Sequence, residues 1–181
     1  MDISSHRQIL FPTTLTSKNV QPVLDNISHL AKENNDPITL LFRNALGGEV
    51  CPGLLLYDVI RATHVPIIGI VRRNVSSIAS IVLQGCDYRH MAKGSTMMIH
   101  SVVASIELPL QLKENTEELT IPVGSVLRKL GESLERAHDL IDIVHSHSSL
   151  PKETIVAMLN ATTYLSAEEA LRVGLIDEVV L

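Results

Sequence analysis

Apolar residues along the first hundred positions recur with two different periods. The segments Ile38–Phe42 and Pro66–Val71 are short, continuous apolar runs, which are typical of strands buried on both faces of a parallel sheet. The segment Ser17–Glu33 has a helical period instead. Its apolar positions are Val20, Val23, Leu24, Ile27 and Leu30. The alternation of the two patterns predicts an α/β fold with right-handed crossovers.

The same patterns extend this assignment to the rest of the chain. Further strands are predicted over Gln8–Phe11, Tyr88–Ala92, Thr96–His100 and Ile176–Val180. Further helices are predicted over Pro52–Ala62, Ser77–Cys86, Val123–Ser146 and Pro151–Leu159, and one more follows a capping box of Ser166 and Glu169. The stretch Ser101–Pro122 is polar, acidic and without a period. Because neither a repeat nor a linker is visible, residues 1–181 are expected to form one domain.

Composition excludes several classes of function. A hydrophobic fraction of 45% and a mean hydropathy of +0.22 suit a buried sheet and further subunit interfaces. A net charge of -5, 3% aromatic residues and the absence of a basic block argue against nucleic-acid binding. The apolar runs are too short to span a bilayer and no signal-peptide pattern opens the chain, so we expect a cytoplasmic protein. Cys51 and Cys86 lack metal-ligand spacing and are expected to be buried, reduced thiols.

Three short segments carry residues suited to acyl-transfer chemistry. They are Asn44–Val50 with a glycine pair, Asn74–Ser80 with serines at a helix start, and Met97–His100 with a histidine at a strand end. A serine nucleophile, a histidine base and free glycine amides are the parts that such chemistry needs. Each segment alone also has an ordinary structural explanation, namely a tight turn, a helix cap and a structural histidine.

The order and spacing of these segments resemble the ClpP-type serine peptidases of the caseinolytic family. Residues Met98–His100 match the family's Met-Ile-His strand end. The other matching residues are Asn44–Val50, Gly53, Leu56–Asp58, Leu165–Ala170 and Gly174–Asp177. The likeness extends from about Arg7 to Val180. It implies the ClpP/crotonase α/β spiral of ββα-like units, with a protruding long helix for oligomerisation.

The resemblance also implies roles for individual residues. Ser77 takes the place of the nucleophile, because the family's separation from Gly48 is preserved there and Ser76 would be one residue short. His100 becomes the general base, and the amides of Gly48 and Ile78 form the oxyanion hole. Residues that would border an extended peptide substrate are Gly47, Glu49, Val50, Ser101 and Val102. The implied reaction is hydrolysis of short or unfolded polypeptides, without a metal or a cofactor.

The chain departs from the family at the third member of the catalytic triad. The family has an aspartate there, whereas this chain has Met158. A methionine cannot accept a hydrogen bond from imidazole as a carboxylate does, so reduced activity is expected. Asn160 is the nearest substitute, and Asp139 and Asp142 are more remote candidates. A Ser-His dyad without a third member is the other alternative.

The resemblance implies a homo-oligomeric ring, either a heptamer or stacked heptamers. The family's AAA+ unfoldase partner is not the expectation for this chain, because the chain starts almost at its first strand and has Leu40 and Phe42 where the family has tyrosines. Two other functions are left open. The first alternative is a catalytically weak or inactive paralogue that acts as a scaffold. The second is a crotonase-type thioester enzyme, because the segment Gly85–Arg89 also resembles the crotonase superfamily.

One further group of residues has the spacing of metal ligands. His138, Asp142 and His145 share one face of the predicted long helix. We expect this face to be solvated or to form an interface rather than to hold a metal.

Overall fold

A computed structural model describes residues 5–101, 111–112, 119–120 and 123–181, and its centre is a mostly parallel sheet. The strands of this sheet are β1 (Gln8–Leu10), β3 (Ile38–Ala45), β5 (Ile67–Ser76), β6 (Tyr88–Ala92), β7 (Thr96–Ile99), β10 (Thr163–Ser166) and β11 (Glu178–Val180). Their order is β1-β3-β5-β6-β11, with β7 paired to the end of β5 and β10 paired to β7. The predicted α/β class with a parallel sheet is confirmed, because every described strand pair of this sheet except β7–β10 is parallel.

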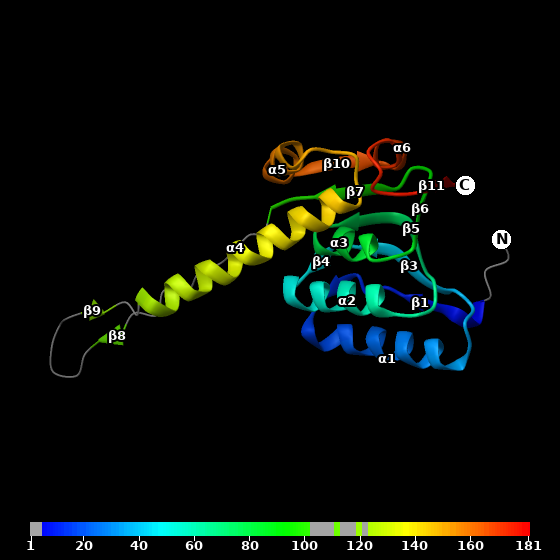
Figure 1. The fold of residues 1–181 in the computed structure, drawn as a ribbon, viewed down its shortest axis with the longest axis horizontal. Helices are drawn as coiled ribbons and strands as arrows, with labels where there is room; N and C mark the ends of the chain where they lie inside the picture. The colour runs from blue at the N-terminus through cyan, green and yellow to red at the C-terminus, as the bar shows by residue number, and fades with distance from the viewer. Residues whose placement is uncertain (1–4, 102–110, 113–118, 121–122) are drawn as a thin grey trace.

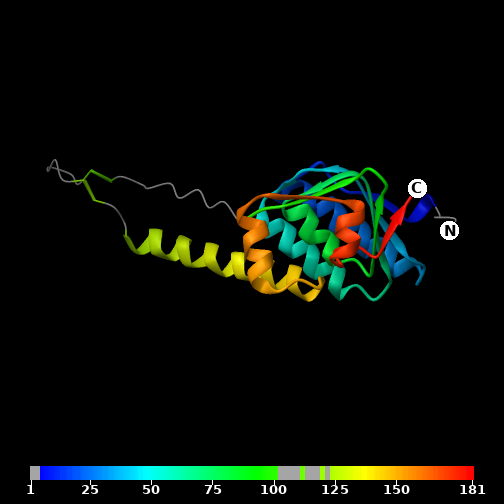
Figure 2. The ribbon, with the colours of Figure 1, turned by 90° about the horizontal axis from the view of Figure 1, so that it is seen from above.

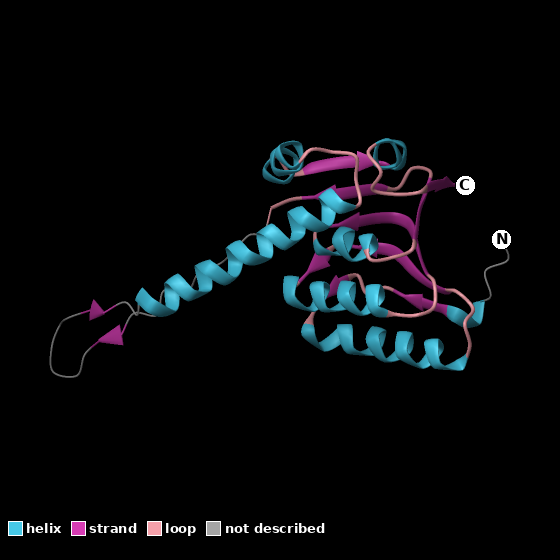
Figure 3. Ribbon diagram, in the orientation of Figure 1, coloured by secondary structure: helices cyan, strands magenta, loops and turns pink. Residues whose placement is uncertain are grey.

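Helices cover one face of this sheet. They are α1 (Ser17–Glu33), α2 (Val50–Ala62), α3 (Ile78–Gln84), α4 (Val123–Ser146), α5 (Lys152–Asn160) and α6 (Ala167–Arg172), and a 3-10 turn η1 (Ser5–Arg7) precedes β1. Helices α1, α2 and α3 lie side by side against the sheet, and α5 and α6 lie beside β10 (Figures 1 and 2). The first part of α4 extends away from this body (Figure 3). None of these helices combines the length and apolar character that crossing a membrane requires.

Burial on both faces explains the continuous apolar runs of the central strands. Leu40 and Phe42 of β3 and Val71 of β5 point into the main core with the helices. Leu41, Ile68 and Ile70 form a second buried cluster. A strand that is buried on both sides needs apolar residues at every position, which is the pattern that the sequence shows.

Two features of the strands differ from the sequence prediction. Strand β5 continues to Ser76, five residues beyond the predicted end, although Arg72, Arg73 and Asn74 are exposed. Backbone pairing with β3 and β7 carries the strand through this polar stretch. Strand β10 was not predicted, since its four residues are too few to show a strand period and its pairing with β7 is not visible in the sequence. Cys86 is buried as expected, whereas Cys51 is exposed.

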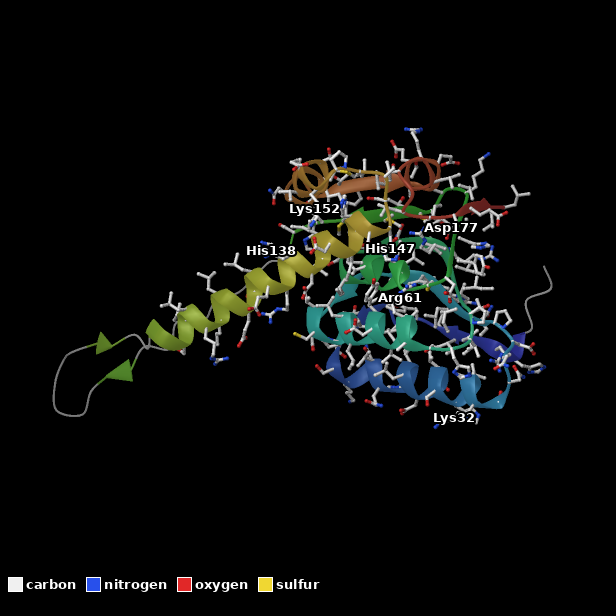
Figure 4. The ribbon with its side chains drawn as sticks, in the orientation of Figure 1. Lys32, Arg61, His138, His147, Lys152 and Asp177 are labelled. Carbon is white, nitrogen blue, oxygen red and sulfur yellow. The ribbon has the colours of Figure 1, made fainter. Side chains whose placement is uncertain are left out.

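A polar network joins α3 to β6 and to the residue before the last strand. Arg89 forms a two-pronged ion pair with Asp177, with Nη2–Oδ1 and Nε–Oδ2 distances of 2.7 and 3.0 Å. Its Nη1 donates to the side chain of Gln84 at 2.6 Å. It also contacts the carbonyl of His147 at the end of α4, and Figure 4 shows His147 and Asp177 near each other there. Burial opposes ionisation of Asp177, but hydrogen bonds and the charge of Arg89 outweigh it and hold the pKa of Asp177 below its ordinary value.

We expect Asp177→Asn to lower the free energy of unfolding by about 1 kcal/mol at neutral pH, because Arg89 loses its charged acceptor while solvent screens part of this partly exposed ion pair. The stabilisation that comes from the lowered pKa of Asp177 is present above the ordinary aspartate pKa and is lost as pH falls through the lower folded value. The variant should therefore lose less stability than the wild type on acidification. Urea unfolding at neutral and acidic pH measures both effects, and equal stability of the two proteins at neutral pH would contradict the assignment.

Candidate active site

Ser77 lies at the junction between β5 and α3 in a strained backbone conformation. Its φ of 57° and ψ of -134° are unusual for a residue other than glycine. The amide of Ser77 donates to the carbonyl of Met98 at 2.8 Å. The carbonyl of Ser77 accepts from the hydroxyl and the amide of Ser80, at 2.6 and 3.0 Å. Such conformations persist where the surroundings enforce them, and they are concentrated at functional sites.

His100 follows β7 directly and reaches this serine. Because β5 and β7 run parallel, with Ser76 opposite Met98, both strands end at the same edge of the sheet. The Nε2 atom of His100 lies 2.7 Å from the Oγ atom of Ser77. For Nε2 to accept the serine proton, the proton of the neutral imidazole must reside on Nδ1. This is the geometry that a serine nucleophile and its general base need.

The glycine pair forms the third side of the site. Gly47 and Gly48, with φ angles of 97° and 138°, form the short strand β4 (Gly47–Gly48), which pairs with β2 (Thr14–Leu15). A Cβ atom on Gly47 would lie 2.6 Å from the Cβ of Ser77, and one on Gly48 would collide with the carbonyl oxygen of Leu15. Only glycine therefore allows this turn to pack between β2 and the serine.

The two strands that carry these segments are also joined by side chains. Asn74 donates through Nδ2 to the Oδ1 atom of Asn44 at 3.0 Å. The pair lies where β3 and β5 leave the sheet towards the glycine turn and the serine. It was not predicted as a functional pair, although each asparagine opens one of the two sequence segments.

A cavity of about 270 Å³ adjoins the serine and the histidine. Gly48, Ser77 and His100 line it together with Ile78, whose amide belongs to the first residue of α3. Amides of a first helical turn have no partner within the helix and can donate to an oxyanion. The other lining residues are Val50, Ser80, Ile81, Ile99, Ser101, Leu140 and Leu159. This wall is mostly apolar and suits an apolar side chain next to the reacting bond.

Only some of the residues predicted to border the substrate lie at the larger cavity. Val50 and Ser101 line the cavity, and Gly47 packs against Ser77. The carboxylate of Glu49 accepts hydrogen bonds from the hydroxyl and the amide of Ser17, at 2.6 and 3.1 Å, so it joins the start of α1 to the glycine turn. Val102 lies outside the described residues.

A smaller cavity of about 100 Å³ adjoins His100 and is also lined by Asn160, the predicted substitute for the triad aspartate. Within the described parts of the chain, Ser77 is the one hydrogen-bond partner of the His100 side chain, and no hydrogen bond joins it to Asn160. Met158 is half-buried against the main core and lines neither cavity.

The more remote acidic candidates lie elsewhere. Asp139 and Asp142 line a separate cleft between α2 and α4 with Tyr57 and Asp58. Asp142 pairs with Lys152 at 2.6 Å, and this hydrogen bond holds the pKa of Asp142 below its ordinary value. Figure 4 shows Lys152 close to α4. The described side chains contain no group of three or more histidine, cysteine, aspartate or glutamate residues placed to hold a metal ion.

Sequence reasoning missed two residues of the site. Ser80 is buried and both caps the Ser77 carbonyl and lines the larger cavity. Leu140 of α4 lines both cavities. The position of Ser80 one turn after Ser77 was a visible signal. No local pattern connects Leu140 to Ser77 and His100, which lie 63 and 40 positions earlier in the chain.

Comparison with known proteins shows the family to which the chain is related. The sequence model of the Clp protease family matches residues 1–181. The chain is 30% identical over 176 residues to the ATP-dependent Clp protease proteolytic subunit of Deinococcus radiodurans, covering 96% of this chain and 80% of that protein. It is 25% identical over 178 residues to the protein of the same name from Cyanophora paradoxa, covering 97% and 85%. Because the family model matches the chain over residues 1–181, this chain belongs to the Clp protease family.

Proposed function

We propose that this member of the Clp protease family is a serine endopeptidase in which Ser77 is the nucleophile and His100 the general base. The observation that supports this proposal is the 2.7 Å contact between Oγ of Ser77 and Nε2 of His100. Ser77 Oγ attacks the carbonyl carbon of the scissile peptide bond while its proton moves to Nε2 of His100. The amides of Gly48 and Ile78 donate to the oxyanion that forms.

The reaction then proceeds through an acyl-enzyme. His100 returns the proton to the leaving amine nitrogen, the C–N bond breaks, and the acyl group stays on Ser77 as an ester. A water molecule next attacks the ester carbonyl and gives its proton to His100, which passes it to Ser77 Oγ as the carboxylic acid product leaves. Neither a metal nor a cofactor takes part in these steps.

The cavity next to Ser77 supports a substrate class. An extended, unfolded segment fits along Gly47–Val50 on one side and Ser101 on the other, held by main-chain hydrogen bonds as an added strand. Ile81, Ile99 and Leu140 would receive an apolar side chain of that segment. Glu49 contributes through its backbone, since its carboxylate is engaged by Ser17.

The missing aspartate lowers the expected rate. In a complete triad the carboxylate holds the imidazole in the correct tautomer and stabilises its charged form, and disabling it costs about 10⁴ in turnover. Asn160 lines the cavity next to His100 and is the side chain that we propose to take part in orienting the ring. The enzyme is therefore a slow peptidase rather than an inactive scaffold.

Helix α4 is the element that we propose for assembly into a homo-oligomeric ring. Leu127, Leu130 and Leu134 are exposed along its projecting part at helical spacing. Large apolar side chains in such a row are favourable when another subunit covers them. The unfoldase partner of the family stays open for this chain, as does the choice between a heptamer and stacked heptamers.

Labelling with a fluorophosphonate tests the nucleophile. We expect the wild type and Ser76→Ala to be labelled and Ser77→Ala to lose the label, because, of these two serines, it is Ser77 whose hydroxyl contacts His100 in the described structure. Peptide mass spectrometry locates the label, and size-exclusion chromatography shows that each variant keeps its assembly state. Loss of label in Ser76→Ala alone would move the nucleophile by one residue. Absence of label in all three folded proteins would favour the scaffold function.

A further inference from the structure

His100 lines two cavities, and Ser77 lines the larger of them but not the smaller one, which Asn160 lines instead. The Nε2 atom of His100 is engaged by Ser77, so Nδ1 is the ring nitrogen that remains for a third catalytic group. When Nε2 accepts the proton of Ser77, Nδ1 carries a hydrogen and needs an acceptor.

The protein places a second polar group on the same cavity without joining the two. Asn160, an exposed residue at the end of α5, lines the cavity opposite His100. In the described part of the chain, its side chain forms no hydrogen bond with the ring. The volume of about 100 Å³ is larger than the space of about 30 Å³ that one water molecule takes up in the liquid. A small polyatomic ligand therefore fits between the two side chains.

We propose that this cavity binds a small free carboxylate, such as formate or acetate, which stands in for the missing catalytic acid. One carboxylate oxygen accepts the Nδ1 hydrogen of His100, and the other accepts from the side-chain amide of Asn160. The proposal rests on the proposed peptidase function and deepens it, because it makes the activity of Ser77 depend on a small anion. No bond is made or broken at the carboxylate, which keeps its charge throughout.

The lining of the cavity explains why such an anion would raise the rate of the chemical step rather than the affinity for the substrate. Most of it is apolar, from Ala137, Leu140, Ile141, Val156 and Leu159. A carboxylate gains little there next to a neutral imidazole, but much more when His100 becomes an imidazolium, because charges attract more strongly in a less polar environment. An interaction that is stronger in the transition state than in the ground state raises kcat rather than lowering KM.

The test compares anions at constant pH and ionic strength. Hydrolysis of a short fluorogenic peptide and the rate of fluorophosphonate labelling are measured in sodium chloride, sodium formate, sodium acetate and sodium sulfate. We expect formate and acetate to raise kcat by about tenfold or more over chloride, with little change in KM, a part of the 10⁴ that a fixed carboxylate contributes. Sulfate controls for a general salt effect on folding.

A nearly isosteric variant locates the binding site. Asn160→Asp supplies a fixed carboxylate at the cavity, so it should raise kcat in chloride and abolish the stimulation by formate. Asn26→Asp adds the same charge at an exposed position of α1 and should respond to formate as the wild type does. Ala137→Leu reduces the cavity volume and should weaken stimulation by acetate more than by formate.

The outcomes separate this inference from the function on which it rests. Equal labelling and turnover in chloride and formate, with Ser77 still labelled, would overturn the carboxylate site and leave the peptidase intact. Undiminished stimulation of Asn160→Asp would overturn it as well. Absence of labelling in every buffer would overturn both proposals.

Discussion

Replacing His100 by alanine is expected to lower kcat/KM for a short peptide by about 10²-fold. In a complete triad, removing the serine or the histidine costs about 10⁶, and about 10⁴ of that already depends on the carboxylate. A site without a fixed acid has lost most of this factor before the histidine is removed. The remaining contribution of His100 is the proton transfer that its 2.7 Å contact with Ser77 allows.

The double variant Ser77→Ala/His100→Ala shows whether the two residues act as one unit. Its activity should equal that of Ser77→Ala, because a base without its nucleophile contributes nothing further. His64→Ala, at an exposed position between α2 and β5, is the matched control and should keep wild-type kcat/KM. A loss of less than about threefold in His100→Ala, outside the expected range for general-base catalysis, would mean that another group takes the serine proton.

Much of this site could be predicted from sequence because its parts come from consecutive strand ends. Ser77 and His100 directly follow β5 and β7, Gly48 comes three residues after the end of β3, and parallel neighbours end at one edge. The order of the segments along the chain therefore determines their proximity once the sheet is predicted. The same reasoning did not predict the positive φ of Ser77, because that angle depends on tertiary contacts such as the hydrogen bond from the Ser77 amide to the carbonyl of Met98 in β7.

The surroundings of His100 were less accessible to sequence reasoning. Asn160 was named from the sequence only as the nearest substitute for the acid. The cavity that it shares with His100 depends on how α4 and α5 pack, and Leu140 and Val156 are among its walls. The Arg89–Asp177 pair joins residues 88 positions apart and has no local signal. Contacts of this kind follow from tertiary packing rather than from the period of a single segment.

Replacing Gly48 by alanine is expected to lower kcat by about 10²–10³-fold, the usual effect of losing one oxyanion donor. The added methyl group would collide with the carbonyl of Leu15, so β4 must move away from β2 and carry the Gly48 amide with it. The φ of 138° also disfavours alanine. Because the amide acts on the charged intermediate, kcat should fall much more than KM rises.

Gly94→Ala separates the collision from the backbone strain. Gly94 also has a positive φ, of 82°, but a methyl group there would meet no atom within 4 Å. This variant should lose about 1 kcal/mol of stability and keep its kcat, since only the strain applies. Peptide hydrolysis and urea unfolding of both variants supply the comparison. If folded Gly48→Ala kept its kcat within about threefold, far less than the loss of an oxyanion donor causes, the Gly48 amide would not be the donor and the oxyanion would have to rest on Ile78 alone.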